Sequence, residues 1–317
     1  MIQEIDEKGR LLQAAPLRIG ISTRALFDLE EEHAVFEQEG VWAYAELQLK
    51  REGLLISKGT GFDVIERLLR LNVDGERPFV EVVLLSRNSP DLSLRAFNSI
   101  ESYRLGIKTG SFTSGRPIGP YVSGWAIDLF LSNEDTDVRA AVEAGAAAAK
   151  LGLPPANPIE IAEDEVRIAF DGDAVVFSAE SDEIYKQQGL AAFMKHERDN
   201  ATKPMSGGPF GNFLKKLSNL RDIYIDDKGF SKVRIAIVTA RNAPAHARVV
   251  HTLRAWGTPA DEAHFVGAFE KASILKACGA HIFFDDQEKH VLGASAVVPA
   301  GHVPGPHEAD APVIPAA

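Results

Sequence analysis

The sequence lacks three features that would each define a class of protein. Its 317 residues include one cysteine, Cys278, so no intramolecular disulfide can form and a reducing compartment is expected. No run of about 18 apolar residues occurs, and the charged first ten residues lack the apolar core of a signal peptide. No block of Lys or Arg stands out against a net charge of −11, which argues against nucleic acid and anionic membranes as partners. These absences predict a soluble cytoplasmic protein.

What the sequence does contain is an ordinary globular composition in an alternating pattern. Hydrophobic residues make up 45% of the chain and charged residues 25%, enough apolar content for a sizeable core. Short apolar runs alternate with amphipathic segments, a pattern that predicts α/β architecture with a mostly parallel sheet. Strands are predicted at 17–21, 79–85, 126–131, 166–170, 233–238, 263–267, 280–284 and 296–298. Helices are predicted at 33–51, 60–71, 91–103 and 136–150, the last from its alanine content.

The chain divides near the Pro-rich segment 154–158. We expect a polar lead-in over residues 1–16, a first α/β unit over 17–158 and a second over 159–298. The second unit carries an insertion, residues 178–232, that is rich in helix-forming residues. The Pro- and Ala-rich segment 299–317 is expected to be a disordered tail.

The two units resemble distant copies of each other. Leu17–Phe27 aligns with Val166–Val176 at an offset of 149 residues, and two further blocks align at offsets of 154 and 153. Any two α/β units can align to some extent, so duplication is one of two interpretations. If it is correct, Ser22, Arg24, Ser132 and Asn133 of the first unit stand where the second unit has four aspartates. The first unit would then be a pseudo-domain without the acidic site.

Two of those aspartates, Asp171 and Asp173, directly follow the predicted strand 166–170. Side chains alternate along an extended chain, so residues i and i+2 point to the same side and both carboxylates can reach one site. Ligands bind at the carboxyl ends of strands in open α/β sheets. A surface turn is the alternative for such a pair, but apolar residues both precede and follow this one. The pair therefore predicts a site for a cation and a phosphate.

Three further elements of such a site follow in order. Thr239 ends the next predicted strand, and its hydroxyl can bind a phosphoryl oxygen or simply cap a helix. Lys271 lies after the third strand, where an ammonium would neutralise a nucleophile and a phosphate. Asp285 and Asp286 end a buried strand and offer the hard oxygen ligands that Mg²⁺ prefers. Four such coincidences in the order acid pair, Thr, Lys, acid pair are improbable by chance. The order also argues against a receiver domain, in which the clustered acids precede a separate phosphoacceptor aspartate.

This order resembles the haloacid dehalogenase phosphohydrolase superfamily, and five motifs narrow the likeness. They resemble the cytosolic type I 5′-nucleotidase family from about Leu17 to Val303. The motifs are Ile19–Phe27, Ala169–Val175, Val238–Arg241, Leu253–Gly257 and His281–Gln287. The resemblance implies a Rossmann-like parallel sheet of the haloacid dehalogenase type with a helical cap insertion, preceded by the related pseudo-domain. It also implies Mg²⁺-dependent hydrolysis of nucleoside 5′-monophosphates such as AMP.

The resemblance assigns roles to the ordered residues. Asp171 would be the nucleophile that forms an aspartyl-phosphate, and Asp173 the acid that protonates the leaving oxygen and then the base that activates water. Asp171, Asp285, Asp286 and the carbonyl of Asp173 would hold Mg²⁺. Thr239 and Lys271 would bind the remaining phosphoryl oxygens.

Candidate substrate contacts come from polar loops and from the expected cap. Each has a competing interpretation as a solvated loop or as part of the core. Phe177, Phe193, Phe210 and Phe213 are candidates for contacts with the base, with cap core as the alternative. The polar candidates are Arg241, Asn242, Lys203, Gly207, Gly208, Ser86, Arg87, Asn88 and the segment Phe112–Gly115 with Thr113 and Ser114.

Two other functions stay open at the level of the sequence. One is a related phosphatase for another small phosphate ester, and the other is a nucleotide-binding regulator with vestigial hydrolysis. Nine histidines raise the question of a transition-metal site, but only His281 and His290 lie near the acidic residues, where structural roles are expected. A nucleoside 5′-monophosphate is the expected partner, and assembly into a homo-oligomer is left open.

Overall fold

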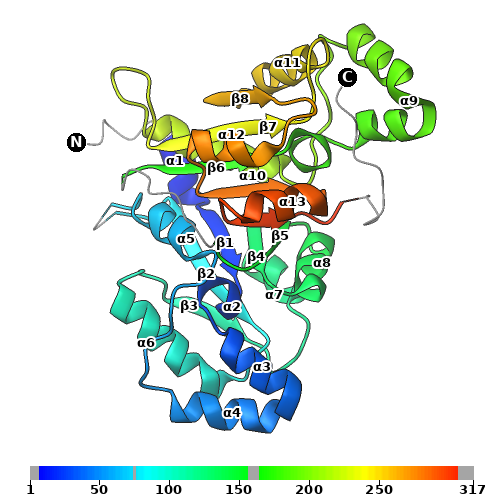
Figure 1. The fold of residues 1–317 in the computed structure, drawn as a ribbon. Coiled ribbons are helices and arrows are strands. Elements are labelled where there is room, and N and C mark those ends of the chain that lie inside the picture. Colours follow the sequence, from blue (N-terminus) through cyan, green and yellow to red (C-terminus); the bar gives the residue numbers. More distant parts are fainter. Residues whose placement is uncertain (1–6, 74–75, 156–163, 306–317) are drawn as a thin grey trace.

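A computed structural model describes residues 7–73, 76–155 and 164–305. Its centre is one ten-stranded sheet with helices on both faces (Figure 1), which confirms the predicted α/β class with a mostly parallel sheet. The strands are β1 (Leu17–Ile21), β2 (Val80–Ser86), β3 (Thr109–Phe112), β4 (Leu129–Ser132), β5 (Ala147–Leu151), β6 (Val166–Phe170), β7 (Val233–Thr239), β8 (Glu262–Phe265), β9 (Ile282–Asp285) and β10 (Ala300–His302).

The order of the strands divides the sheet into two similar halves. The order is β3-β2-β1-β4-β5-β10-β9-β6-β7-β8. Every neighbouring pair is parallel except β5 and β10, which are antiparallel where the halves meet. The carboxyl ends of the strands in the two halves therefore lie at opposite edges of the sheet. Each half also has a point where the strand order reverses, between β1 and β4 and between β6 and β9, and such points form ligand crevices in open α/β sheets.

The helices cover the two faces of the sheet as separate apolar layers. On one face, the main core includes buried side chains of α1 (Glu7–Ala14), α5 (Phe62–Leu69), α6 (Ser93–Tyr103), α10 (Gly211–Ile223) and α11 (His246–Trp256). On the other face, α7 (Gly119–Gly124) and α8 (Asp135–Glu143) cover the first half, and α12 (Lys271–Cys278) and α13 (Glu288–Ser295) cover the second. Cys278 is buried in this second layer, as expected for a small apolar residue.

The alanine-rich segment was predicted as one helix over 136–150, and this was wrong in its second part. Helix α8 ends at Glu143, and Gly145 follows with a φ of 92°, a conformation that breaks the helix. Ala147–Leu151 then forms strand β5 between β4 and β10. Burial between two strands outweighs the intrinsic helix propensity of alanine, which is a weak preference per residue.

The end of the sheet also lies later in the sequence than predicted. Residues 296–298 were expected to be a strand, but they form a turn and a bend after α13, and the strand is β10. Because β10 pairs with β5 and β9, and Val303 is fully buried, residues 300–303 do not belong to a disordered tail. Residues 306–317 of that predicted tail lie outside the described residues, as do residues 1–6 of the lead-in and residues 156–163 near the predicted boundary.

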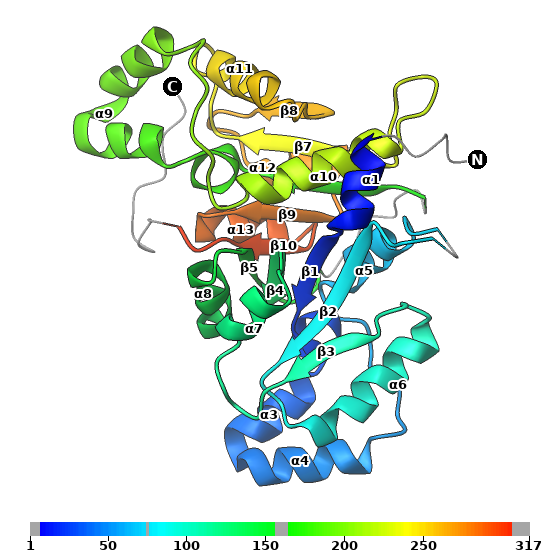
Figure 2. The same cartoon turned by 180° about the vertical axis from the view of Figure 1, so that it is seen from behind.

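Two helical segments differ from the sequence-based expectation. The helix predicted over 33–51 is a hairpin of α3 (Glu30–Glu39) and α4 (Val41–Lys50), because Gly40 between them has a φ of 86°. In the predicted lead-in, residues 7–14 form α1, whose Leu12 is buried and which packs on α10 (Figure 2). Helix α10 lay inside the predicted cap, but its apolar face is part of the core.

The remaining elements are short, apart from one long helix. They are α2 (Thr23–Leu26), the 3₁₀ turn η1 (Pro90–Leu92), the π-type turn η2 (Gly172–Val176) and α9 (Glu180–Asp199). Helix α9 stands away from the sheet at one end of the second half (Figure 1). No helix within the described ranges has both the length and the apolar character needed to span a bilayer.

Candidate active site

Three buried carboxylates meet at the carboxyl ends of β6 and β9. Asp171 directly follows β6, and its backbone N–H donates to the carbonyl of Phe284 in β9 at 2.8 Å. Asp285 ends β9 and Asp286 follows it. One carboxylate oxygen from each of the three lies within 4.8 Å of the others. The sequence predicted this convergence, because the ends of adjacent parallel strands meet at one edge.

Lys271 lies against this cluster and neutralises part of its charge. Its Nζ donates to Oδ1 of Asp171 at 2.6 Å and to Oδ2 of Asp285 at 2.7 Å. The lysine begins helix α12 and only 4% of its surface is exposed. Burial opposes its charge, but Asp171 and Asp285 outweigh this and raise the pKa of Lys271 above its ordinary value. The ammonium therefore stays charged, and the candidate chosen by position is confirmed to lie in the cluster.

The carboxylates respond differently to this environment. Burial, with the neighbouring acids, raises the pKa of Asp171 well above its ordinary value although Lys271 lowers it. Burial also opposes the charge of Asp285, but Lys271 and His290 hold the pKa of Asp285 below its ordinary value. Three acids and one ammonium leave uncompensated negative charge in a buried place. Oxygen donors of this kind suit a hard divalent cation, so the residues present fit Mg²⁺.

Asp173 does not join the cluster with its side chain. The backbone turns through η2, where Ala174 has a φ of 58°, and both carboxylate oxygens of Asp173 face Arg241 instead. Nε and Nη2 of Arg241 donate to Oδ2 and Oδ1 of Asp173, each at 2.7 Å. The Asp173 carboxylate is therefore outside the cluster, although Asp171 and Asp173 line the same cavity, and the resemblance gives only the carbonyl of Asp173 to the cation. The buried Arg241 forms a bidentate ion pair with the Asp173 carboxylate.

Arg241 links Asp173 to a glutamate on helix α9. Its Nη1 donates to Glu197, which is fully buried and also accepts from Arg248 at 3.0 Å and from Ser181 at 2.7 Å. Burial opposes the charge of Glu197, but Arg241 leads the interactions that hold its pKa below the ordinary value. The pKa of Arg241 is raised, because Asp173 and Glu197 outweigh its burial. A chain of buried charges thus connects α9 to the site.

Thr239 lies beside the nucleophile candidate. It ends β7, is almost fully buried, and its Oγ1 accepts the backbone N–H of Arg241 at 3.3 Å. A Cβ added to Gly172 would come within 3.3 Å of that Oγ1, so the backbone after Asp171 and the threonine hydroxyl are close neighbours. The hydroxyl therefore lies where the ordered motif places it.

A small cavity opens onto these groups. Its lining includes seven candidates from the sequence together with further residues on or next to α9, β7 and α13. The residues are Asp171, Asp173, Leu190, Phe193, Thr239, Ala240, Arg241, Asn242, Lys271, Gln287 and His290. About 20 Å³ can hold the centre of a water-sized sphere, which is room for a water or two and far less than the several hundred Å³ of typical ligand pockets.

Several substrate-contact candidates lie elsewhere. Lys203, Gly207 and Gly208 do not line this cavity. Gly208 packs behind it, where an added Cβ would come within 2.3 Å of the carbonyl oxygen of Phe177, so this close approach explains the glycine. The first-half candidates belong to the opposite edge of the sheet. There Ser86, Arg87, Asn88 and Ser114 line a separate cavity, and the buried Thr113 lies in the same loop.

Of the four aromatic candidates, only Phe193 reaches the cavity. Phe210 and Phe213 pack with Phe170 of β6, and the buried Phe177 packs on Trp256, so these three belong to the core. Phe193 of α9 lines the cavity, with its ring centroid 5.6 Å from Cζ of Arg241.

The sequence did not point to the functional positions of three residues. His290 lies with Nδ1 at 3.3 Å from Oδ2 of Asp285, and Gln287 and His290 both line the cavity. Glu197 lies within a helix of alternating charged residues and carries no local signal of burial. The structural role expected for His281 is confirmed, since its Nδ1 accepts the backbone N–H of Arg167 at 2.9 Å.

Similarity to known proteins agrees with this geometry. A family model described as 5′-nucleotidase matches residues 11–310. The chain belongs to the 5′-nucleotidase family. Human cytosolic 5′-nucleotidase 1B is 33% identical over 288 residues, which cover 88% of this chain and 47% of the human protein. The chain therefore spans about half the length of this curated relative. The match includes both halves of the sheet, so the family likeness extends well beyond the acidic cluster.

Proposed function

We propose that the second half of the chain is a Mg²⁺-dependent 5′-nucleotidase that hydrolyses nucleoside 5′-monophosphates such as AMP. The observation that carries this proposal is the contact of Lys271 with Asp171 and Asp285 inside a buried cluster of three carboxylates. Such a site is costly for stability and has the charge and oxygen donors that phosphoryl transfer needs. Membership of the 5′-nucleotidase family supports the choice of substrate.

Asp171 acts as the nucleophile in the first step. One of its carboxylate oxygens attacks the 5′-phosphorus in line, the bond from phosphorus to the 5′-oxygen breaks, and an aspartyl-phosphate forms. Lys271 already contacts Asp171, and Thr239 lies beside it, so both can hold phosphoryl oxygens as their charge redistributes. Lys271 also favours the ionised form of Asp171, which burial opposes.

Asp173 moves the protons. In the first step it gives a proton to the leaving 5′-oxygen of the nucleoside. In the second step its carboxylate takes a proton from the water that attacks the aspartyl-phosphate, which releases phosphate and restores Asp171. The bidentate contact with Arg241 fixes the orientation of Asp173 and separates its environment from that of Asp171. Two neighbouring aspartates in different surroundings can take different roles.

Asp171, Asp285 and Asp286 would hold Mg²⁺, with the carbonyl of Asp173 as the further predicted ligand. When bound, the ion supplies positive charge that neutralises the phosphate and the clustered carboxylates. His290 contacts Oδ2 of Asp285, the oxygen that also accepts from Lys271, and so helps to position that carboxylate.

Helix α9 acts as the cap of a haloacid dehalogenase-type domain. The cavity has room for a water but not for a nucleotide, so a substrate can enter only if α9, which contributes Leu190 and Phe193, moves away. Such a movement also separates Glu197, which lies on α9, from Arg241, which follows β7. Closure of α9 therefore restores the orientation of Asp173 at the same time as it excludes bulk water.

The remaining parts of the proposal concern organisation and location. Residues 159–298 form the catalytic domain and residues 17–158 a related pseudo-domain, with β10 of the catalytic half extending to residue 302. The human relative is named cytosolic, and with a single cysteine this supports a cytoplasmic location.

Phosphate release from a substrate panel tests the proposed function. The panel contains nucleoside 5′-monophosphates, 3′-monophosphates and sugar phosphates, each with Mg²⁺ and with EDTA. We expect release from the 5′-nucleotides with Mg²⁺ alone. Release from sugar phosphates without release from nucleotides would replace the proposal by a related phosphatase, and no Mg²⁺-dependent release at all would favour a nucleotide-binding regulator.

A further inference from the structure

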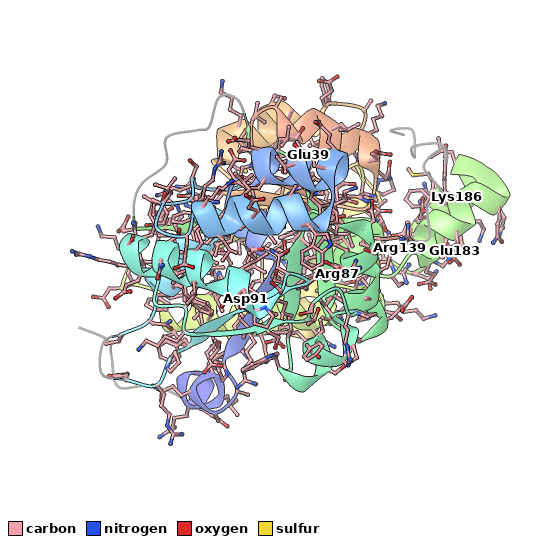
Figure 3. All side chains as sticks on the ribbon, turned by 90° about the horizontal axis from the view of Figure 1, so that it is seen from below. Glu39, Arg87, Asp91, Arg139, Glu183 and Lys186 are labelled. Carbon is pink, nitrogen blue, oxygen red and sulfur yellow. The ribbon has the colours of Figure 1, made fainter. Side chains whose placement is uncertain are left out.

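A second cavity, much larger than the one at the acidic cluster, lies near strand ends in the first half, whose described residues include no acidic cluster of that kind. It measures about 480 Å³, within the range of small-molecule sites. Its walls come from the ends of β1, β2 and β4, from the α3/α4 hairpin and from the loop after β3. The residues used below are Ser22, Arg24, Phe36, Tyr44, Ser86 and Arg87. Figure 3 shows Arg87 beside the α3/α4 hairpin, while Glu183 and Lys186 of α9 lie well to one side.

This cavity occupies the place in the first half that the active site occupies in the second. β1 and β6 start 149 residues apart, and Gly40 and Gly189 are separated by the same number. Gly40 has φ 86° and ψ −176°, and Gly189 has φ 78° and ψ 179°, so the helical segments after β1 and after β6 bend in the same way. The α3/α4 hairpin is therefore the counterpart of α9, and the cavity lies beneath it.

The first half has serines where the active site has its nucleophile and a cation ligand, but it also has a hydroxyl at the position of Thr239. Ser22 follows β1 as Asp171 follows β6, and Ser132 ends β4 as Asp285 ends β9. Neither serine is a carboxylate, so a cation has no equivalent ligands there. Ser86 ends β2 as Thr239 ends β7, which retains the hydroxyl at the place of a phosphate ligand.

Two arginines supply positive charge to the cavity, and the carboxylates that hold them can release them. Arg24 donates to Glu30 at 2.7 and 2.9 Å and to Glu134 at 2.8 Å. The side chains of Glu30 and Glu134 are 42% and 47% exposed, and ion pairs of this kind contribute little to stability. Arg87 is 45% exposed and its nearest carboxylate, Asp137, is at 3.6 Å. A dianionic phosphate can compete for both guanidinium groups through bidentate contacts.

Two aromatic side chains form part of the wall of the same cavity. Phe36 of α3 and Tyr44 of α4 line it, and their rings form an edge-to-face pair with centroids 5.9 Å apart. The side chain of Phe36 is exposed although it is large and apolar, so a flat ring that covers it removes apolar surface from water. The cavity thus joins a cationic, hydroxyl-lined end to an aromatic side.

We propose that this first-half cavity is a second, non-hydrolytic site for a phosphate ester of an aromatic compound, in the class of the nucleotides. The choice of a phosphate ester rests on the proposed function of the second half, of which this site is the counterpart. The phosphate binds Arg24, Arg87 and the hydroxyls, and the ring lies against Phe36 and Tyr44. The ligand stays intact because Ser22 stands in place of the nucleophile, and Ser132 and Asn133 stand in place of the cation ligands Asp285 and Asp286.

Hydrogen exchange with AMP as the probe tests the proposal, because it shows which part of the chain the ligand protects. The full chain carries Asp171→Asn, so that AMP is not consumed, and peptides from residues 80–92 and 109–116 report the first half. Peptides from residues 233–245 and 282–290 report the second. We expect AMP to slow exchange in both groups of peptides. At the first-half peptides, adenosine and inorganic phosphate should each bind at least tenfold more weakly than AMP.

Two further variants assign the effect to the cavity. Arg87→Ala should raise the AMP concentration for half-maximal protection of the first-half peptides at least tenfold and leave the second-half peptides unchanged. Ala45→Trp, which fills the cavity, should do the same. The exposed Arg116, in the same loop region but not part of the lining, provides the matched control Arg116→Ala, which should change neither group.

Each outcome separates this site from the proposed function. Protection of the second-half peptides alone overturns the second site and leaves the nucleotidase intact. Protection of the first-half peptides alone upholds the second site and contradicts the nucleotidase. First-half protection that neither Arg87→Ala nor Ala45→Trp weakens overturns the assignment to this cavity, and no protection anywhere overturns both proposals.

Discussion

Replacing Lys271 by methionine removes the one ammonium from the acidic cluster and keeps the length of the side chain. In the wild-type chain its Nζ lies 2.6 Å from Asp171 and 2.7 Å from Asp285, and all three side chains are almost fully buried. Without the ammonium, the cluster of Asp171, Asp285 and Asp286 keeps only negative charge. The variant therefore tests whether this contact organises the site.

The magnitude follows from the burial of the pair. Removing one partner of a buried ion pair costs about 3–5 kcal/mol, because the other partner is left without compensation. We expect the free energy of unfolding of Lys271→Met in EDTA to fall by about that amount at pH 7. The deficit should shrink as the pH falls, because protonation of Asp171 then replaces the lost neutralisation. Added Mg²⁺ should restore more stability to the variant than to the wild type. Phosphate release should drop about 10²- to 10³-fold, as for loss of one preorganised charge.

Chemical denaturation and phosphate release measure the two effects. The matched control is Lys276→Met, which makes the same change at an exposed position of the same helix, α12. Because surface substitutions change stability by about 0.5 kcal/mol or less, this control should resemble the wild type in both assays. The double variant Lys271→Met with Asp171→Asn should recover stability but no activity. Equal stability and equal turnover of Lys271→Met and Lys276→Met would refute the reasoning.

Two further predictions concern buried titratable groups. Glu197→Gln should lower the free energy of unfolding by about 3 kcal/mol and reduce turnover about tenfold, because Arg241 loses its buried anionic partner on α9. The exposed Glu183→Gln on the same helix should change neither quantity, and equal effects of the two would contradict the coupling. Burial lowers the pKa of His281 from 6.5 to about 4, so the folded chain favours the neutral ring. Stability should be unaffected above pH 6.5 and fall by up to about 3 kcal/mol as the pH drops from 6.5 to 4. His281→Asn, whose amide oxygen can still accept from Arg167, should flatten the pH dependence of denaturation in that window; an unchanged slope would contradict it.

The site residues that the sequence predicted correctly are those whose position in the sheet follows from the order of the strands along the chain. Asp171, Thr239 and Asp285 each lie at the end of an apolar run, and adjacent parallel strands bring such ends together. Lys271 could be chosen by the same reasoning. Strands β1 and β6 were predicted with their observed bounds, since each is a short, mostly apolar run with β-branched residues that ends before a polar residue.

The errors arose where tertiary contacts outweigh local preference. Ala147–Leu151 has the composition of a helix and becomes a strand because two strands enclose it. The partner of Asp173 was not predicted either: the turn at η2 directs its carboxylate to Arg241, and no feature of the Asp-Gly-Asp segment indicates this contact. Glu197 contacts Arg241, which is 44 residues further along the chain, and no local pattern in the sequence indicates that these two residues meet. Likewise, Arg87 was predicted as a substrate contact, but the antiparallel junction of β5 and β10 places it at the edge of the sheet opposite the acidic cluster.

Hydrolysis of AMP by the wild type and by Asp171→Asn tests the central claim most directly. The fold should persist in the variant, and in EDTA its stability should equal or exceed that of the wild type, because burial and the neighbouring acids, which raise the pKa of Asp171, both oppose a negative charge at this position. We predict phosphate release by the wild type with Mg²⁺, and none above background by the wild type in EDTA or by Asp171→Asn with Mg²⁺. Substantial Mg²⁺-dependent turnover by Asp171→Asn would contradict the account.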